Sequence, residues 1–469
     1  MLPKRLFAAL QPAYHFLMAW LAAAIYRFPS NKLIIIGVTG TSGKTSTVYM
    51  LAKTLAGAGY KAGFSSTAMF GDGDSEWLND KKMTMVGGFF NQRFLRSLVK
   101  NHCQYAIVET TSEGVKQFRH RFINYDILLF TNLAPEHIES HGSYEKYREA
   151  KGKLFAHLRR CHTKYRNENY YIVSPSSELK KLDLSRIKKT IIVNGDDKEA
   201  PYFLSFWSEV KFAYSSNLQL KPEELALGGD VSRVKDIKIA NFGDIDASEN
   251  GTSFNFQDTR IYLKLLGGFN AQNAAAAAVC GLSQDIPLEK VKASLESVKT
   301  LSGKMEKVDA GQDFTAVVDY AFEPGALSKL YEVVSMFPKK KVIHVLGSCG
   351  GGRDKARRPI LGRIAGEHAD IVIVTNEDPY DDNPAQIIEE VVIGAMQAGK
   401  EEGNDLFKFL DRREAIKKAV DLAEAGDFLL LTGKGSEQFI CIQNGQKIPW
   451  DDRTVLKEEI VDKLCIDKS

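Results

Sequence analysis

The 469-residue sequence has few cysteines, and their spacing matches no common metal or redox motif. The six cysteines lie far apart, at Cys103, Cys161, Cys280, Cys349, Cys441 and Cys465. There is no C-x-x-C pair, and no His/Cys cluster has the spacing of a zinc site. We therefore predict a protein of the reducing cytoplasm without a structural metal.

The sequence also lacks a long block of charges of one sign, internal repeats and low-complexity segments. Its 62 basic and 59 acidic residues leave a formal charge of +3, so composition gives no reason to expect a nucleic-acid surface. With 44% hydrophobic residues, the chain is long enough for two or three packed cores. We expect several globular domains, whose partners have to be inferred from their sites.

A long uninterrupted apolar run is missing as well, although the apolar stretch "FLMAWLAAAIY" (16–26) follows Lys4 and Arg5 and imitates a signal peptide. Cleavage and export would place the later stretch "GTSGKTST" (40–47), which is typical of a nucleotide-binding loop, where nucleoside triphosphates are scarce. The segment from Leu6 to Tyr26 is almost long enough to cross a bilayer, but Gln11, Pro12 and His15 interrupt it. We favour a helix in residues 1–30 that docks on the protein or lies on a membrane surface, with a true span as the alternative.

What the sequence does contain is a regular alternation of short β-branched runs and helical segments. Up to about residue 200 the expected strands are "KLIIIGV", "YAIVET", "YDILLFTNL" and "TIIVNGDD". Between about Tyr202 and Leu266 short alternating runs such as "TSFNFQDTRIYLKLLG" predict antiparallel strands, and the alanine-rich helix "NAQNAAAAAVCGL" follows. This pattern predicts an α/β domain over residues 31–300, with a mainly parallel sheet and a small antiparallel sheet.

A second alternating unit is expected over residues 301–469. Its predicted strands are "TAVVDY", "KVIHVLG", "DIVIVTNEDP" and "DFLLLTGKG", separated by helices in a Rossmann-like arrangement. One helix, residues 385–398, carries apolar side chains at helical spacing on one face: Ile387, Ile388, Val391, Val392 and Ala395. That stripe predicts a helix packed on the sheet.

The stretch "IIIGVTGTSGKTST" (34–47) joins an apolar strand to a loop rich in glycine and hydroxyl groups. Its spacing is G-x-x-G-x-x-G-K-T, because Val38 stands where the usual G-x-x-x-x-G-K-[ST] motif has its first glycine. Glycines permit tight turns that aim backbone N–H groups at phosphate oxygens at a helix N-terminus. We expect Lys44 to reach the outer phosphates of a triphosphate and the Thr45 hydroxyl to hold magnesium; a glycine turn without a ligand is the alternative.

Two polar side chains follow the next strands. Glu109 ends "YAIVE", and His137 follows the strand in "LLFTNLAPEH". Open α/β sheets bind ligands at this carboxyl edge. Taken singly, each is more often an exposed loop residue, but together with Thr45 they predict a magnesium site near the triphosphate.

At this point the sequence resembles the Mur ligases, and most closely those of the MurE type. The resemblance runs from about Leu33 to Arg453. Its blocks, in family order, are "GVTGTSGKTST", "VETTSEG", "FTNLAPEHIESHGSYEKYREAKGKLF", "VNGDD", "GGFNAQNAAAA", "GKMEKVDAG", "VDYAFEPGAL", "GGGRDKARRP", "VTNEDPYDDNP", "DRREAI", "GKGSE" and "DDR".

The resemblance implies an ATP-dependent amide ligase of peptidoglycan precursor synthesis. ATP phosphorylates a substrate carboxylate, and the amine of an amino acid attacks the acyl phosphate. Hydroxide is a poor leaving group, so phosphorylation supplies a better one, and magnesium with Lys44 would stabilise the transferred charge. The implied partners are a muramyl-peptide acceptor and an amino acid, with no nucleic acid, and we expect a monomer.

The resemblance also implies roles for individual residues. The nucleotide would be bound by Gly40, Thr41, Ser42, Gly43, Lys44, Thr45, Ser46, Asn273, Lys304 and Asp319. Magnesium would be held by Thr45, Glu109, His137 and Lys151, and Lys151 takes the position of a lysine carbamylated by carbon dioxide, which turns a cation into an anion. A solvated helix lysine is the alternative for Lys151. Substrate would be contacted by Thr84, Arg353, Glu377, Asp378, Tyr380, Gly433 and Glu437.

Several positions depart from the family pattern. Glu113 replaces a histidine, Lys304 an arginine and Phe322 a histidine. Lys304 keeps the charge but loses the planar guanidinium, and Phe322 removes a polar contact. These changes leave ATP use expected, and they leave open whether catalytic efficiency is reduced.

The largest departure precedes the phosphate loop, where only about thirty residues stand and typical Mur ligases have a domain that holds uridine diphosphate. Such a short apolar segment cannot form that pocket. We therefore expect an acceptor that is gripped differently, lacks UDP or sits on a lipid near a membrane.

The amino acid is predicted from "TNEDPYDDNP". In diaminopimelate-adding relatives the corresponding residues read D-N-P-R, and the arginine grips the second carboxylate of that amino acid. Here Glu377, Asp378, Pro379 and Tyr380 stand instead, so we expect L-lysine or another basic or neutral amino acid. Glu437 falls where the family recognises the amine. The alternative is that Glu377 and Asp378 only cap the following turn.

Three rival functions remain at this stage. A folylpolyglutamate-synthase-like ligase shares the fold and reaction but is disfavoured by "GGFN", "GKMEKVDAG" and "GKGSE". A nucleotide-dependent switch such as a GTPase is disfavoured because no N-K-x-D motif occurs. A ligase that has lost activity and serves as a scaffold is kept open by residues 113, 304 and 322.

Overall fold

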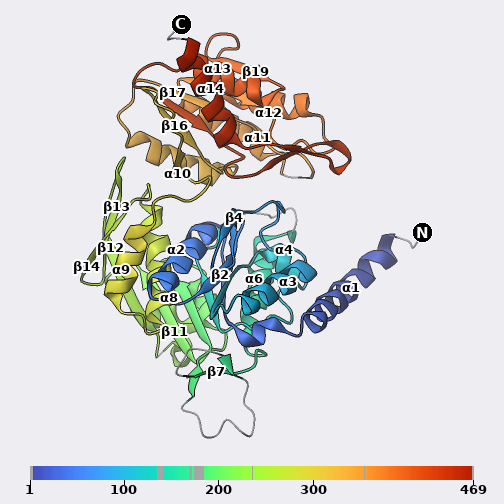
Figure 1. Cartoon of the computed structure of the whole chain (residues 1–469), viewed down its shortest axis with the longest axis vertical. Coiled ribbons are helices and arrows are strands. Elements are labelled where there is room, and N and C mark those ends of the chain that lie inside the picture. Colours follow the sequence, from blue (N-terminus) through green and yellow to red (C-terminus); the bar gives the residue numbers. More distant parts are fainter. Residues whose placement is uncertain are drawn as a thin grey trace. The chain divides into compact units, whose positions relative to one another are not determined.

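The computed structural model describes residues 4–134, 141–167, 172–173, 184–234, 236–352 and 354–466. The chain forms two compact units (Figure 1). The N-terminal unit comprises Met1–Asp246, Thr252–Lys264 and Gly268–Lys299, and the C-terminal unit comprises Ala247–Gly251, Leu265–Gly267 and Thr300–Ser469.

The N-terminal unit is built on an eleven-stranded sheet in the order β14-β13-β12-β11-β10-β6-β1-β5-β2-β3-β4. β1 is the buried central strand "IIIGVT", whose apolar run is typical of a parallel strand covered on both faces. The strands are β1 (Ile34–Thr39), β2 (Ala62–Ser65), β3 (Met69–Gly71), β4 (Glu76–Leu78), β5 (Tyr105–Glu109), β6 (Ile127–Phe130), β10 (Thr190–Asn194), β11 (Val210–Ser215), β12 (Lys238–Ser248), β13 (Gly251–Phe256) and β14 (Thr259–Leu263). A small antiparallel sheet holds β7 (Lys164–Arg166), β8 (Ile172–Val173) and β9 (Ser185–Ile187).

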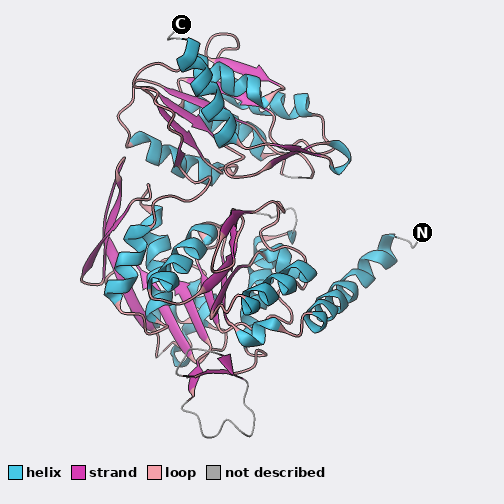
Figure 2. Cartoon of the chain, in the orientation of Figure 1, coloured by secondary structure: helices cyan, strands magenta, loops and turns pink. Residues whose placement is uncertain are grey.

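Helices cover both faces of this sheet (Figures 1 and 2). α2 (Lys44–Gly57), α8 (Phe269–Leu282) and α9 (Leu288–Ser297) pack together on one face. α3 (Gly88–Lys100), α4 (Ser112–Lys116), α6 (Tyr144–Leu158) and α7 (Ala200–Leu204) contribute to the apolar core on the other face. Short 3-10 helices lie at Pro29–Lys32, Pro222–Leu225, Leu227–Gly229 and Val231–Arg233. The predicted α/β class with a mainly parallel sheet is confirmed.

The expectation of antiparallel strands between about Tyr202 and Leu266 is confirmed in part. The run "TSFNFQDTRIYLKLLG" forms the antiparallel hairpin of β13 and β14, which extends the large sheet. The expectation is wrong for β11 and β12, because β11 pairs parallel with β10 and β12 pairs parallel with β11. Alternation of polar and apolar residues reports one exposed face of a strand, and it carries no information on the direction of the neighbouring strand.

α1 (Lys4–Ile25) is the predicted N-terminal helix, and it packs against α3. The backbone comes close there, because a Cβ atom on Gly88 would lie 3.6 Å from the Cα of Ala19. Among the residues that the structure describes, no helix combines the length and apolarity needed to cross a bilayer. The alternative of a true membrane span is therefore not supported.

A buried ionic cluster ties the amino end of β6 to neighbouring segments. The carboxylate of Asp126 accepts from the Nζ atoms of Lys164 at 2.6 Å and Lys189 at 2.8 Å, and from the backbone N of Ile35 at 2.9 Å. None of the three charged side chains is more than 3% exposed. Burial lowers the pKa of Lys164 to about 8, against the opposing effect of Asp126. One carboxylate thus serves two buried cations.

The C-terminal unit has a six-stranded sheet in the order β15-β16-β20-β17-β18-β19, parallel except for the β15–β16 pair. Its strands are β15 (Glu306–Lys307), β16 (Thr315–Val318), β17 (Val342–Leu346), β18 (Ile371–Thr375), β19 (Leu406–Phe409) and β20 (Phe428–Leu431); a separate hairpin is formed by β21 (Phe439–Cys441) and β22 (Lys447–Pro449). A 3-10 turn lies at Gln443–Gly445. The predicted Rossmann-like arrangement is confirmed.

Two apolar cores lie on the two faces of this second sheet. One contains side chains of α10 (Pro324–Ser335), α11 (Arg357–His368) and α12 (Pro384–Gln397). The other contains side chains of α13 (Arg412–Leu422) and α14 (Asp452–Ile466). α12 begins where the Asn383 side chain accepts from the backbone N of Ala385, with Pro384 in the first turn. Its predicted stripe, Ile387 to Ala395, is buried as expected.

We expect Asp126→Asn to destabilise the N-terminal unit by about 3–5 kcal/mol, because two buried lysines lose their counter-charge. The free energy of unfolding, measured by urea titration, checks this. The matched control is Asp74→Asn, whose exposed carboxylate pairs with Lys61 at the surface and should matter little. A loss for Asp126→Asn no larger than for the control would contradict the role of the cluster.

Candidate active site

The loop between β1 and α2 has the backbone of a phosphate cradle. Gly40 and Gly43 have φ values of +154° and +78°, the latter in the left-handed region that favours glycine. A Cβ atom on Gly43 would lie 2.2 Å from the Oδ1 of Asn273, and one on Gly40 would lie 2.0 Å from the Oγ1 of Thr131. Glycine is therefore the residue that fits at both positions.

The helix that follows this loop is open to an anion. α2 begins at Lys44, no side chain caps its first turn, and that turn contains no acidic residue. Its first N–H groups have no partners within the helix, and the helix dipole adds partial positive charge there. Ser46 is buried in the same turn. The loop and helix together can hold phosphate groups.

Neighbouring side chains fix the loop itself. Asn132, which follows β6, accepts from the backbone N of Ser42 through Oδ1 at 2.8 Å and from the backbone N of Thr41 through its carbonyl at 2.8 Å. The Oγ1 of Thr131 donates to the Ser42 carbonyl at 2.7 Å. Lys44 Nζ donates to the Thr41 carbonyl at 2.7 Å, so its ammonium lies over the loop. Loop shape thus depends on residues some 90 positions away.

A chain of oxygen atoms runs from the loop to the end of β5. Thr45 Oγ1 donates to Glu109 Oε2 at 2.9 Å, and the backbone N and Oγ1 of Thr67 donate to the same carboxylate at 2.8 and 2.9 Å. The hydroxyls of Thr67 and Thr84 are 2.8 Å apart. Glu109 is only 1% exposed. Hydroxyl and carboxylate oxygens are the ligands that magnesium prefers, so Thr45 and Glu109 fit a magnesium ion.

Lys151, on α6, contacts the loop at Gly40. Its Nζ donates to the Gly40 carbonyl at 2.8 Å and lies 4.7 Å from the ring centre of Tyr147, in a side chain only 2% exposed. The hydroxyl of Tyr147 is 3.2 Å from the Oγ1 of Thr41. α6 therefore presents a buried lysine to the phosphate loop, and the alternative of a solvated lysine is wrong.

Sequence reasoning missed one imidazole. His141 Nε2 lies 3.1 Å from the Oγ of Ser112 and 3.3 Å from Glu113, and its ring centre is 5.2 Å from that of Tyr147. Its position in "HIESHG", four residues after His137, was the available indication. His137 itself lies outside the described residues, as does Arg353. Glu113, which replaces a family histidine, thus has a histidine beside it.

In the C-terminal unit, four strands end in polar residues at one edge of the sheet. Asp319 follows β16, Cys349 follows β17, Glu377 and Asp378 follow β18, and Lys434 follows β20. Lys434 is fully buried, and its Nζ bonds the Asp378 carboxylate at 3.0 and 3.1 Å and Glu437 Oε2 at 2.5 Å. This edge is rich in acid groups.

Glu377 differs from its neighbours. Its Oε1 accepts from the Cys349 thiol at 2.8 Å, whereas its buried Oε2 has no hydrogen-bond partner among the described residues. A Cβ on Gly433 would lie 2.4 Å from that oxygen. Burial raises the pKa of Glu377, and it raises the pKa of the Cys349 thiol well above its usual value. A polar atom of this kind indicates a missing partner.

Other predicted residues of this unit have defined contacts. Asp319 accepts from the backbone N of Met305 at 2.8 Å and of Ala321 at 2.6 Å, and so fixes the turn that carries Lys304. The Nζ of Lys304 lies 5.0 Å from the ring centre of Tyr320, whose hydroxyl donates to Glu437 at 3.2 Å.

Phe322 and Tyr380, two residues that depart from the family pattern, have the following surroundings. Phe322, in place of a family histidine, lies beneath the guanidinium of Arg357, which is 5.4 Å from the ring centre. Tyr380, in place of the family arginine, has a φ of +51° and donates its backbone N–H to the Cys441 carbonyl at 3.1 Å.

A buried ion pair supports this sheet edge from behind. Arg412 binds Asp452 with two hydrogen bonds of 2.8 and 2.6 Å and donates to the carbonyls of Asn376 at 3.1 Å and Thr432 at 2.8 Å. The Nε2 atom of His344 forms a hydrogen bond of 2.9 Å with the Oγ1 of Thr432. Burial lowers the pKa of His344 to about 3. The motif residues Arg412 and Asp452 therefore position the loops that carry Glu377 and Gly433.

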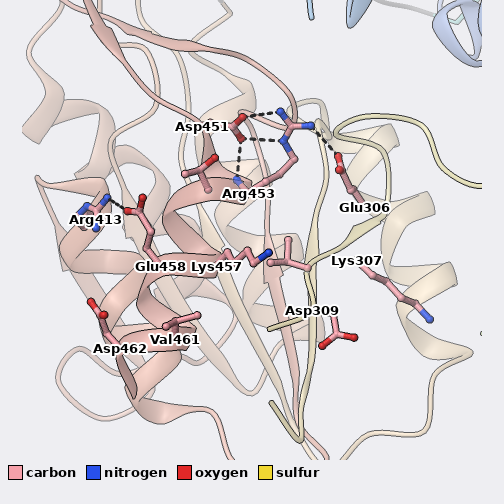
Figure 3. A pocket seen from close by; sticks show the side chains of 12 residues that line it. Glu306, Lys307, Asp309, Arg413, Asp451, Arg453, Lys457, Glu458, Val461 and Asp462 are labelled. Carbon is pink, nitrogen blue, oxygen red and sulfur yellow. Dashed lines mark hydrogen bonds and ion pairs between the residues drawn. The ribbon is translucent and has the colours of Figure 1, made fainter. Parts of the chain in front are cut away.

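A groove of ≈ 720 Å³ lies elsewhere on the same unit (Figure 3). It is lined by residues of β15, α13 and α14, and none of the predicted site residues lines it. Two of its arginines pair with acids of the same groove: Arg453 bonds Asp451 and Glu306, and Arg413 bonds Glu458. The groove is thus distinct from the strand-end cluster.

We expect Gly43→Ala to lower affinity for ADP at least about tenfold, because a left-handed backbone costs a non-glycine residue about 1–2 kcal/mol and the new Cβ displaces Asn273. Calorimetric titration with ADP measures this. Gly59→Ala is the matched control, since Gly59 has a φ of +95° and no atom within 4 Å of its added Cβ. Equal affinities of the two variants would contradict the cradle.

Comparison with known proteins agrees with this geometry. Residues 38–281 match the family model of the Mur ligase middle domain, and residues 303–435 match that of the Mur ligase glutamate ligase domain. A UDP-N-acetylmuramyl-tripeptide synthetase of Roseiflexus sp. (strain RS-1) is 34% identical over 441 residues, which cover 93% of this chain and 80% of the relative. A UDP-N-acetylmuramoyl-L-alanyl-D-glutamate--2,6-diaminopimelate ligase of Geobacillus kaustophilus is 31% identical and is covered to 82%.

Solved structures support the same fold. A UDP-N-acetylmuramoyl-L-alanyl-D-glutamate--2,6-diaminopimelate ligase structure has a TM-score of 0.57 at 24% identity, covering 92% of this chain and 79% of that one. Mycobacterium tuberculosis folylpolyglutamate synthase has a TM-score of 0.62 at 16% identity, covering 91% and 92%, which shows a shared fold alone. The two family models together with the relatives above 30% identity decide the assignment: this chain belongs to the Mur ligase family, the ATP-dependent amide-forming ligases of peptidoglycan precursor synthesis.

Proposed function

We propose that this chain adds an amino acid to the carboxylate of a muramyl-peptide acceptor in the cytoplasm, acting as a monomer, at the expense of ATP. The observation that carries the proposal is the phosphate cradle at Gly40–Gly43, with Glu109 bonded to Thr45 and Lys151 bonded to the Gly40 carbonyl. The amide bond needs an activated carboxylate, because hydroxide leaves poorly. Phosphoryl transfer from ATP to the acceptor carboxylate supplies that activation, and the amine then displaces phosphate.

Each group at the cradle has a role in this reaction. Lys44, which now donates to the neutral Thr41 carbonyl, would exchange that bond for a stronger charge-assisted bond to a phosphate oxygen. Thr45 and Glu109 would hold magnesium, with His137 as a further ligand. Magnesium bound there would neutralise phosphate charge. Asn273 lies against Gly43, where it limits the space for the nucleotide.

We expect Lys44→Ala to reduce phosphate release at least about 10²-fold, since it removes a preorganised charge at the transferred group. The assay follows phosphate release from ATP with muramyl dipeptide acceptors, with and without UDP, and a set of amino acids. Release by the parent should require both acceptor and amino acid. Activity of Lys44→Ala within about tenfold of the parent would argue against the assignment of Lys44 to the transferred phosphate. Phosphate release by the parent that does not depend on added amino acid would favour a nucleotide switch or a scaffold.

Lys151 is proposed to carry a carbamate. Its nitrogen is buried beside Gly40, within reach of the loop that binds phosphate. A bare ammonium there would attract the phosphates directly. A carbamate would instead bring oxygen atoms to the magnesium side of the site, where they would add an anionic ligand to those of Thr45 and Glu109.

Lys151→Ala should therefore lose activity and regain part of it with acetate or formate, which can fill the anionic gap. Lys153→Ala, two residues further along the same helix on an exposed side chain, is the matched control and should need no rescue. Intact-mass or crystallographic evidence for an unmodified Lys151 in active enzyme would refute the carbamate.

The strand-end cluster of the C-terminal unit is proposed to bind the incoming amino acid. The described basic side chains nearest to Glu377 are already bonded to acids: Lys434 to Asp378 and Glu437, and Arg412 to Asp452. A second carboxylate on the amino acid would meet acid groups, whereas a side-chain ammonium could pair with the partnerless oxygen of Glu377. Arg353, Gly433 and Tyr380 are proposed to line the same site, with Thr84 contacting substrate in the N-terminal unit.

We accordingly predict faster turnover with L-lysine, or another basic or neutral amino acid, than with diaminopimelate at equal concentrations. Asp378→Asn should weaken use of lysine more than ADP binding, because its carboxylate also orients Lys434. The exposed Asp381→Asn, in the same segment, serves as the control. Preference for diaminopimelate would overturn this specificity while leaving the ligase assignment intact.

A further inference from the structure

α1 has one face on the protein and one apolar face in solvent. Ala19, Ala22 and Ala23 are buried on the side that packs against α3. On the opposite side, Tyr14, Leu17, Trp20 and Ile25 are 59%, 55%, 46% and 56% exposed. Phe16 is 43% exposed and contacts the rings of Phe118 and Phe122. In Figure 1 the amino-terminal end of α1 projects away from the other helices of its unit.

An exposed stripe of this kind needs an explanation, since soluble surfaces rarely gather large apolar side chains. From Leu6 to Tyr26 the helix contains no charged residue, so its outer face offers water no ionic contact. The exposed Trp20 and Tyr14 carry polar atoms on apolar rings, as do the aromatic residues that lie at the boundary of a bilayer. The described part of α1 is thus apolar on both faces: alanines form the face that packs on the protein, and larger apolar side chains form the face in solvent.

The segments around α1 are basic throughout. The sequence has no acidic residue before Asp72, and none occurs in α3 or in residues 114–125, which are two of the segments that α1 contacts. The basic residues of α1, of residues 26–32, of α3 and of residues 114–125 are Lys4, Arg5, Arg27, Lys32, Arg93, Arg96, Lys100, Lys116, Arg119 and Arg121. Two acidic residues border this set: Glu113 pairs with His141 and, at 3.8 Å, with Lys116, and Asp72 accepts from the Asn101 side chain at the end of α3.

We propose that α1 and its basic surroundings form a docking surface for an anionic lipid bilayer, with the helix lying in the plane of the interface. Apolar side chains would enter the acyl region, and the lysines and arginines beside them would meet lipid phosphates. A second copy of the chain fits less well, because a symmetric contact would bring two basic surfaces together. The apolar stripe gives affinity for lipid, and the basic set gives preference for anionic lipid.

The test is co-sedimentation of the full chain with vesicles of phosphatidylglycerol and phosphatidylcholine, compared with vesicles of phosphatidylcholine alone. The parent should bind the anionic vesicles, and added salt should weaken binding. Leu17→Gln/Trp20→Gln should reduce the partition coefficient at least about tenfold. Leu218→Gln/Tyr262→Gln, at 70% and 60% exposed positions of the same unit, should leave it unchanged.

The charge is tested separately. Arg93→Gln/Lys100→Gln should reduce binding to anionic vesicles several-fold and flatten its salt dependence, whereas Lys264→Gln/Lys290→Gln, exposed elsewhere on the unit, should not. ADP binding checks that every variant is folded. Failure of the parent to bind anionic vesicles, or equal binding by Leu17→Gln/Trp20→Gln, would overturn the proposal. So would self-association of the parent in solution that this same variant abolishes, which would assign the stripe to a second copy.

Discussion

The close approach of other side chains to the backbone of Gly40 and Gly43 is the constraint on which the N-terminal site depends. Asn273 occupies the space beside Gly43, and Thr131 occupies the space beside Gly40. Lys151 donates to the Gly40 carbonyl. These three residues come from three separate segments, so the shape of the loop depends on the tertiary structure of the whole unit. The loop in turn determines where Lys44 and Thr45 can meet phosphate and magnesium.

In the C-terminal unit, buried ion pairs fix the loops of the candidate site. Arg412 forms an ion pair with Asp452 and donates to the carbonyls of Asn376 after β18 and Thr432 after β20. These bonds fix the two loops relative to each other. Lys434 then gathers Asp378 and Glu437, and one oxygen of Glu377 stays without a described partner. The fixed charges are thus satisfied within the fold, which leaves Glu377 as the group best suited to recognise a ligand.

The sequence predicted the elements of the fold and the loop residues Lys44, Thr45 and Glu109, because their chemistry follows directly after apolar strands. It could not predict that Thr67 and Asn132 complete the site, since these contacts join backbone and side chains far apart in the chain. Nor could it show that Asp378 is bonded to Lys434, 56 residues away. The direction of β11 and β12 was also wrong, because alternation of residue types does not encode strand direction. His137 and Arg353 lie outside the described residues, so their roles stay predictions.

The central claim is that the phosphate cradle serves amide formation and not hydrolysis alone. The most direct measurement is mass spectrometry of the acceptor after incubation with ATP, magnesium and lysine, together with the amount of phosphate released. The account predicts that the acceptor gains the mass of one lysine residue and that one phosphate is released for each amide formed. Phosphate release without any change in the mass of the acceptor would contradict it.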